Sequence, residues 1–272
     1  MSKKNFIFFK FFININCDFK TYIVKQTYLD INICYNLYEE TLTNNQRENC
    51  FVFLLVCCTI WSMKKIEAIY CDFDGTITKK DSVNVFFEMF ASEKWLYYED
   101  LWIKGKISSK ENAINQVKLL NNISQRQLED YINSIEIDEY FLDFVDYVKS
   151  KNIKLTILSD GFDLFIQKTL ERYNLDIPYY ANKFIYDNGK FSIEFPYYNQ
   201  NCDKKAGMCK CQKVTENYFC YIGDGTSDLC IASKADILFA SKNLHKYCEE
   251  NDIKHHYFTS FCDIINMLGE KK

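Results

Sequence analysis

Asp72 and Asp74 are the first residues in the chain whose types and spacing suggest chemistry. They are separated by Phe73 and follow the apolar run Ile66 to Cys71, which predicts a buried strand. Both carboxylates are therefore expected at the carboxyl edge of a sheet, on the same side. Two acids so close together are costly unless a cation lies between them, and hard oxygen ligands with room for water and phosphate indicate Mg²⁺.

This pair of acids favours phosphoryl chemistry. Asp72 is expected to attack phosphorus, while Asp74 protonates the leaving oxygen and later activates a water molecule. Gly75 lets the backbone approach the phosphate. An isolated Asp-x-Asp in a loop more often provides surface charge or forms a turn. The position of this pair directly after a buried strand favours catalysis instead.

A second polar segment follows the apolar run Ile153 to Leu158, which also predicts a buried strand. In this segment, the hydroxyl of Ser159 and the flexible backbone at Gly161 lie at the entrance to a helix expected near Asp163. Groups at the start of a helix readily hold phosphate oxygens. We therefore predict that Ser159, Asp160 and Gly161 bind the substrate phosphate. A serine at this place taken alone is more often just a helix cap.

A third set of acids follows the run Phe219 to Ile222. Asp224 and Asp228 stand at this strand end with glycines that allow a sharp turn. Asp224 is a candidate metal ligand. Asp228 either binds the metal through water or orients a ligand, so the predicted metal site is drawn from Asp72, Asp74, Asp224 and Asp228.

The elements that must position these side chains alternate along the chain. Strand-like runs, the fourth being Asp236 to Phe239, alternate with amphipathic stretches, which predicts an α/β fold with a mostly parallel sheet flanked by helices. We predict a core formed by residues 63–80 and 136–272. Residues 1–62 are crowded with Phe, Ile, Asn and Tyr, and Met63 resembles a natural start, so this N-terminal extension is expected to be dispensable or unstructured.

Two insertions are expected near the sheet edge. Residues 81–135 carry apolar positions at helical spacing and predict a small helical cap inserted after the first strand, followed by a helix from about Asp138 to Lys149. Residues 179–198 flank Asp187-Asn188-Gly189 with aromatic runs, which predicts a β-hairpin near the active site. The cap and this hairpin are expected to set substrate identity.

In their order along the chain, these motifs resemble those of the haloacid dehalogenase superfamily of phosphatases. The resemblance covers residues 63 to about 245, and the inserted helical cap resembles the phosphoserine phosphatase branch. It implies a Rossmann-like fold, with Asp72 as nucleophile, Asp74 as acid and base, and Ser159 as the phosphate-binding hydroxyl. It further implies that Asp224, Asp72 and the backbone carbonyl of Asp74 bind Mg²⁺.

The resemblance also requires a lysine. Gly207-Met208-Cys209-Lys210 and the Ser159 segment look most like phosphatases acting on 2-hydroxy-3-keto-5-methylthiopentenyl-1-phosphate and on phosphoethanolamine or phosphocholine. Lys210 would then neutralise charge between the nucleophile and the phosphate. Lys213 is the competing candidate. Ser227 stands where relatives often have Asn, and the short spacing from Lys210 to Asp224 requires a brief intervening helix.

Composition limits the partners and the compartment. The net charge of −4 provides no global positive field for nucleic acid. The apolar run Phe51 to Trp61 is about half the roughly 20 residues that a membrane span needs. The 13 cysteines are interpreted as reduced thiols in a cytoplasmic protein. Oligomeric state is not indicated.

Cys202, Cys209 and Cys211 suggest zinc, but they supply three ligands where zinc usually needs four, and no His is nearby in the sequence. The three histidines lie far from the motifs and are assigned to ordinary structural positions.

The leading hypothesis is a Mg²⁺-dependent phosphatase that hydrolyses a small phosphorylated metabolite through an aspartyl-phosphate. Two alternatives remain. One is phosphoryl transfer to an acceptor other than water, as in a mutase, and the other is a non-catalytic module that binds a phosphorylated metabolite.

Overall fold

The computed structural model describes residues 66–202 and 205–269, which belong to one compact unit of the chain. The predicted extension at residues 1–62 lies outside the described residues. Within the described part, no helix is long and apolar enough to cross a lipid bilayer.

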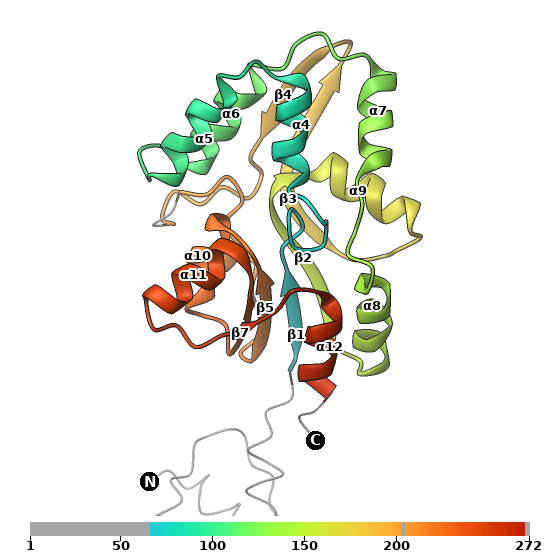
Figure 1. The fold of residues 1–272 in the computed structure, drawn as a ribbon, viewed down its shortest axis with the longest axis vertical. Helices are drawn as coiled ribbons and strands as arrows, with labels where there is room; N and C mark the ends of the chain where they lie inside the picture. Colours follow the sequence, from blue (N-terminus) through green and yellow to red (C-terminus); the bar gives the residue numbers. More distant parts are fainter. Residues whose placement is uncertain (1–65, 203–204, 270–272) are drawn as a thin grey trace, which may run out of the picture. The chain divides into compact units, whose positions relative to one another are not determined.

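A seven-stranded sheet forms the centre of this unit, with the strand order β4-β3-β2-β1-β5-β6-β7 (Figure 1). All neighbouring strands pair in parallel except β3 and β4. The strands are β1 (Ala68–Cys71), β2 (Lys154–Phe162), β3 (Tyr179–Asp187), β4 (Lys190–Glu194), β5 (Phe219–Gly223), β6 (Ile237–Ala240) and β7 (His256–Tyr257). The predicted α/β fold with a mostly parallel sheet is confirmed.

Strand β1 shows why both sheet faces are covered. Its residues are all buried, and they alternate between two apolar clusters: Ile69 and Cys71 pack on one face, and Ala68 and Tyr70 on the other. This period of two is the geometry of a strand with helices on both sides.

Helices from separate parts of the chain cover the two faces. One face packs against α8 (Phe141–Ser150), α9 (Asp163–Arg172) and α12 (Phe261–Gly269). The other packs against α10 (Leu229–Ala232) and α11 (Lys242–Glu250). Two short 3₁₀ turns, η1 (Lys210–Gln212) and η2 (Thr226–Asp228), complete this side.

The segment inserted after β1 is helical, as predicted. It contains α4 (Ser82–Phe90), α5 (Trp95–Ile103), α6 (Ser109–Val117) and α7 (Gln125–Ser134). Asp81, Ser108 and Ser124 cap three of these helices, because each side chain accepts a hydrogen bond from a backbone amide of the first turn.

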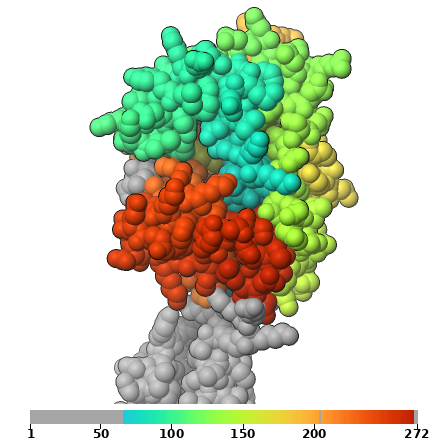
Figure 2. Space-filling view, in the orientation of Figure 1, coloured from blue at the N-terminus to red at the C-terminus, as the bar shows by residue number. Residues whose placement is uncertain are grey.

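An aromatic cluster joins the cap to the β3–β4 hairpin. Phe184 of β3 stacks on Phe162 with 4.2 Å between ring centroids, and both rings contact aromatic side chains of α4. The hairpin turn is the predicted one, with Asn188 and Gly189 both at positive φ. In the space-filling view, the blue-green cap residues face the orange and red residues of α10 and α11 (Figure 2).

Several predicted boundaries shift by a few residues. Strand β2 continues past Leu158 to Phe162 through a register irregularity, so Ser159 lies in a bulged strand rather than in a turn. Helix α8 starts at Phe141, not near Asp138, because the Asp138 carboxylate accepts the backbone amide of Tyr140 and forms a turn. The helix between Lys210 and Asp224 is only the single turn η1, as its predicted brevity requires.

Candidate active site

Asp72 stands at the end of β1, where its backbone amide donates to the carbonyl of Ile222 on β5 at 2.9 Å. The two strand ends are thereby tied together, which brings the acids that follow each strand to one edge. The Asp72 side chain is buried, and its Oδ1 accepts the amide of Phe73 at 2.8 Å.

The ammonium of Lys210 lies among the acids. It is fully buried, 2.9 Å from Asp72 Oδ1 and 2.5 Å from Asp228 Oδ1, and it donates to Ser227 Oγ at 3.1 Å. Burial alone would lower the pKa of Lys210, but the charges of Asp228 and Asp72 outweigh it and raise that pKa, so the lysine stays protonated. Lys213, the competing candidate, instead lies over the rings of Tyr180 and Tyr197.

Both carboxylate oxygens of Asp228 are engaged by the protein. Oδ1 accepts from Lys210 and from the hydroxyl of Tyr221, while Oδ2 accepts the backbone amides of Asp224 and Gly225 at 3.0 and 2.9 Å. Gly223 is needed for this close approach, because a Cβ atom there would stand 2.5 Å from Asp228 Oδ2. Asp228 was predicted either to bind the metal through water or to orient a ligand. This geometry favours the second role, because Asp228 orients the Asp224 loop and Lys210.

Asp224 faces the nucleophile candidate from the end of β5. Carboxylate oxygens of Asp72, Asp224 and Asp228 lie within 4.8 Å of one another, and this all-oxygen donor set fits a hard divalent cation. Asp224 also accepts from Thr76 Oγ1 at 3.2 Å and from Lys242 Nζ at 3.0 Å. Gly75, at a φ of 74°, leaves room for this contact.

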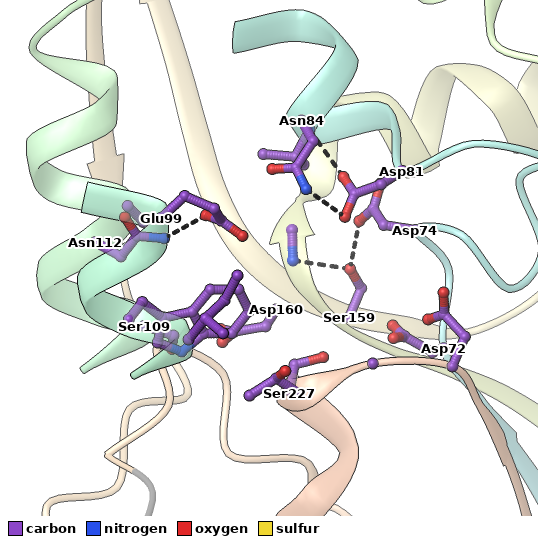
Figure 3. A pocket seen from close by; sticks show the side chains of 18 of the residues that line it. Asp72, Asp74, Asp81, Asn84, Glu99, Ser109, Asn112, Ser159, Asp160 and Ser227 are labelled. Atoms are coloured by element: carbon purple, nitrogen blue, oxygen red, sulfur yellow. Dashed lines mark hydrogen bonds between the residues drawn. The ribbon is translucent and has the colours of Figure 1, made fainter. Parts of the chain in front are cut away.

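Asp74 points to a different set of partners from those of Asp72. Its Oδ1 accepts from the hydroxyl of Ser82 on α4. Its Oδ2 accepts from Ser159 Oγ at 3.1 Å, as Figure 3 shows. Burial raises the pKa of Asp74, and the hydrogen bonds from Ser82 and Ser159 partly oppose that increase. Because the side chain turns away from Asp72, Asp224 and Asp228, only the backbone of Asp74 remains available for the predicted metal site.

The predicted phosphate-binding segment divides into two parts. Ser159 Oγ accepts the amide of Gly161 at 2.9 Å and so lies at the cavity floor between that glycine and Asp74. The Asp160 carboxylate instead holds protein groups, with Oδ1 accepting from Asn182 Nδ2 at 3.0 Å and from the Met208 amide at 2.7 Å. Asp160 therefore anchors the segment that leads to Lys210.

A cavity opens above these acids, between the core and the cap. Its core side is lined by the Asp72, Ser159 and Asp224 segments, and its cap side by polar and aromatic side chains from α4, α5 and α6, including Asn84, Phe87, Glu99, Trp102, Asn112 and Gln116. Figure 3 shows Glu99 and Asn112 joined across the cap, opposite Ser159 and Asp74.

No residue of 179–198 lines this cavity, so the influence expected of the hairpin on substrate identity would act through the residues that it supports. The hairpin instead supports the site from behind, through Asn182 on Asp160 and Phe184 in the aromatic cluster. Sequence reasoning also missed Ser82 and Lys242. Ser82 directly follows the helix cap Asp81 and gives no separate signal, and Lys242 lies at the start of α11, far along the chain from the acids.

Together, the capped Rossmann-like sheet and the cluster of acids around a buried lysine define a class of enzymes that act on phosphoryl groups. A sequence profile of the haloacid dehalogenase-like hydrolase family matches residues 69–233. The chain belongs to this family.

Known proteins of similar sequence are phosphatases. The chain is 30% identical over 213 residues to 2-hydroxy-3-keto-5-methylthiopentenyl-1-phosphate phosphatase from Geobacillus thermodenitrificans, with 76% of this chain and 97% of that protein covered. It is 31% identical over 216 residues to the protein of the same name from Brevibacillus brevis, with the same coverage of 76% and 97%.

A solved structure also shares the fold. A phospho-aspartyl intermediate analogue of phosphoserine phosphatase superimposes with a TM-score of 0.58 at 21% identity, covering 75% of this chain and 99% of that chain. The structural likeness concerns the fold. The family match and the relatives of similar sequence show the chain to be a hydrolase of phosphomonoesters.

Proposed function

We propose that the chain hydrolyses a small phosphomonoester by attack of Asp72 on phosphorus and protonation of the leaving oxygen by Asp74. The observation that carries this proposal is the different setting of the two acids at one cavity. Burial raises the pKa of both carboxyl groups, but the Lys210 ammonium lies 2.9 Å from Asp72 Oδ1 and favours the charged form of Asp72, whereas the hydrogen-bond partners of Asp74 are the neutral hydroxyls of Ser82 and Ser159. A nucleophile needs the charged form, and an acid needs the protonated form.

The described hydrogen bonds of the Asp72 carboxylate both fall on Oδ1, which leaves Oδ2 for attack. In the first step, the Oδ2–phosphorus bond forms while the bond to the leaving oxygen breaks, and that oxygen takes the proton of Asp74. In the second step, water attacks phosphorus and gives a proton to Asp74, while the Oδ2–phosphorus bond breaks, which releases phosphate and restores the Asp72 carboxylate. Ser159 and Lys210 would hold phosphate oxygens throughout.

Asp72, Asp224 and the backbone carbonyl of Asp74 would hold Mg²⁺, with Asp228 keeping the Asp224 loop in place. When bound, the ion supplies positive charge against the phosphate oxygens. Lys242 lies beside this donor set, because its ammonium donates to Asp224 and to the carbonyl of Gly75. The fit rests on the donor chemistry and on the 4.8 Å spread of the acids.

The cap side of the cavity supports a substrate with polar groups next to a short apolar part. Glu99 Oε2 accepts from Asn112 at 2.9 Å and from Gln116 at 3.0 Å, which fixes these three side chains as one polar surface. Asn112 Oδ1 is buried with no hydrogen-bond partner within the described residues, so a substrate donor can satisfy it. Phe87 and Trp102 line the apolar part. We propose 2-hydroxy-3-keto-5-methylthiopentenyl-1-phosphate as the first substrate to test.

The test measures phosphate release with Mg²⁺ from this compound, phosphocholine, phosphoethanolamine and phosphoserine. We expect Asp72→Asn to abolish turnover while the protein stays folded, because Lys210 keeps its pair with Asp228. Asp100→Asn, a change on the exposed side of α5, is the matched control. Near-normal phosphate release by Asp72→Asn would refute the mechanism. Turnover with little free phosphate would indicate a mutase, and binding without turnover would indicate a non-catalytic module.

A further inference from the structure

A group of cysteines surrounds the segment that carries Lys210. Cys202, Cys209 and Cys211 place their sulfur atoms within 4.8 Å of one another, and the Sγ atoms of Cys209 and Cys211 are 3.5 Å apart. Cys202 and Cys209 are buried, and Cys211 is half-buried. This group shares no residue with the acid cluster at the cavity.

A fourth cysteine comes from another element. Cys230 lies on α10, which packs against the η1 turn of Lys210–Gln212. Its thiol interacts electrostatically with Cys211 and Cys202. Its sulfur lies outside the 4.8 Å group of the other three, so a bound metal would draw the Cys230 side chain toward them. The sequence alone suggested only three ligands, because Cys230 is 19 residues beyond Cys211 and belongs to the segment after the Asp224 turn.

The spacing of the sulfurs suits a thiophilic cation. Zinc bound by four thiolates has Zn–S distances of about 2.3 Å, so a regular tetrahedron places the sulfurs about 3.8 Å apart. The three grouped sulfurs lie within 4.8 Å of one another, and the Cys209–Cys211 pair at 3.5 Å is already close to that spacing. Cys202 and Cys230 provide ligands from outside the short Cys209–Cys211 pair, as closed structural zinc sites require.

The surroundings supply the groups that such a site needs. Four thiolates around Zn²⁺ carry a net charge of −2, which positive charge and amide donors stabilise. The ammonium of Lys234 interacts electrostatically with Cys211, Cys230 and Cys209. The backbone amide of Gln212 donates to the Cys209 carbonyl at 3.2 Å and closes the turn between the two ligands of the pair.

We propose that Cys202, Cys209, Cys211 and Cys230 form a tetrahedral zinc site that fastens the Lys210 segment to α10. Lys210 stands between two of the ligands, so the metal fixes the backbone from which its ammonium reaches Asp72. Asp160 holds the same segment from the other side through the Met208 amide. The site is structural and separate from the oxygen ligands proposed for Mg²⁺, and it does not depend on the proposed reaction.

The experiment measures zinc in the purified full-length chain under reducing conditions, by mass spectrometry of the metal after gel filtration. We expect about one zinc per chain, most of which is lost in Cys202→Ser and in Cys230→Ser. Cys262→Ser, a change on α12, is the matched control and should keep the zinc. His245→Gln is the second control, because His245, Glu249 and His255 form another possible metal group, and it should also keep the zinc.

A second measurement does not depend on the variants being folded. The full-length chain loaded with Co²⁺ should show a sulfur-to-metal charge-transfer band and the intense visible bands of tetrahedral cobalt, and excess Mg²⁺ should not remove them. A weak octahedral spectrum would overturn the proposal. So would a chain that binds no zinc, or zinc that survives both cysteine changes or disappears with His245→Gln.

Discussion

Lys210 and Asp72 form a 2.9 Å ion pair in which the lysine side chain is 0% exposed and the aspartate 5%. The same ammonium also neutralises Asp228, so one cation balances two buried acids. A buried pair of this kind contributes little net stability, but removing one partner leaves an uncompensated buried charge. Lys210 is therefore a structural requirement of these buried acids and, in the proposed mechanism, the cation that faces the phosphate.

Lys210→Gln should lower stability and turnover together. The loss of its charge leaves Asp72 and Asp228 facing each other, so we expect unfolding to become about 3–5 kcal/mol easier. Turnover should fall about 10²–10³-fold, because a charged donor to the transferred phosphate is lost. Lys213→Gln is the matched control, since this lysine only lies over Tyr180 and Tyr197. Urea unfolding and phosphate release measure both effects; equal results for the two variants would contradict the assignment.

Gly161→Ala should disable the site by steric displacement. A Cβ atom at this position would stand 2.1 Å from Asp74 Oδ2 and 3.1 Å from Ser159 Oγ, so one of these side chains must move. A displacement of about 1 Å at a reacting group costs about 10²-fold in rate, and we expect a loss of that size in kcat. Gly225→Ala has no atom within 4 Å of its added methyl group and should lose far less. A Gly161→Ala enzyme as active as the Gly225→Ala enzyme would show that Asp74 is not held as described.

Ser82→Ala should change the pH dependence of turnover. The Ser82 hydroxyl bonds to Asp74 and favours its charged form, so its removal raises the pKa of Asp74 further above the usual range. Leaving-group protonation needs protonated Asp74 and fails as pH rises through that pKa. The alkaline limb of kcat/KM should therefore move to higher pH.

Ser108→Ala is the control for this profile, because Ser108 caps α6 in an exposed capping box away from Asp74. Its profile should keep the wild-type position even if the melting temperature falls. An unshifted alkaline limb in Ser82→Ala would remove Ser82 from the list of residues that tune the acid.

The main acids could be predicted because parallel strands end at a common sheet edge. Asp72 and Asp224 follow β1 and β5, which are paired neighbours, and the apolar runs before them identify both strands. The hairpin turn could also be predicted from the local sequence. A turn with positive φ at two successive residues favours an Asn-Gly pair, such as Asn188 and Gly189.

Other contacts depend on tertiary packing and leave no local pattern. Lys242 starts α11 at a φ of 44° and reaches Asp224 and the carbonyl of Gly75 from a distant part of the chain. Cys230 meets the other cysteines only because α10 packs on η1. The position of the 179–198 hairpin depends on packing in the same way: it was expected near the active site, and its Phe184 packs into the aromatic cluster of the cap.

Glu216→Gln should lower stability in a pH-dependent way. Glu216 precedes β5 and accepts from Tyr70 of β1, from Thr215 Oγ1 at 3.0 Å and from Lys154 of β2 at 3.2 Å. Burial pushes the pKa of Glu216 up, but the hydrogen bonds from these three residues outweigh it and lower that pKa to about 2. The folded state thus favours the charged carboxylate of Glu216. Through these contacts Glu216 joins β1, β2 and β5 at the end of the sheet opposite the active site.

The sign of this effect fixes where it should appear. Because the pKa is lower in the folded chain than the ordinary value of 4.5, the stabilisation is complete above pH 4.5 and is lost as pH falls toward about 2. Urea unfolding at pH 7 should show Glu216→Gln to be about 1–2 kcal/mol less stable than the wild type, with a smaller difference at pH 3. Glu194→Gln, which breaks an exposed pair with Lys183, should change stability by less than about 1 kcal/mol at both values. A Glu216→Gln difference that stays constant from pH 7 to pH 3 would mean that its charge does not contribute to joining the strands.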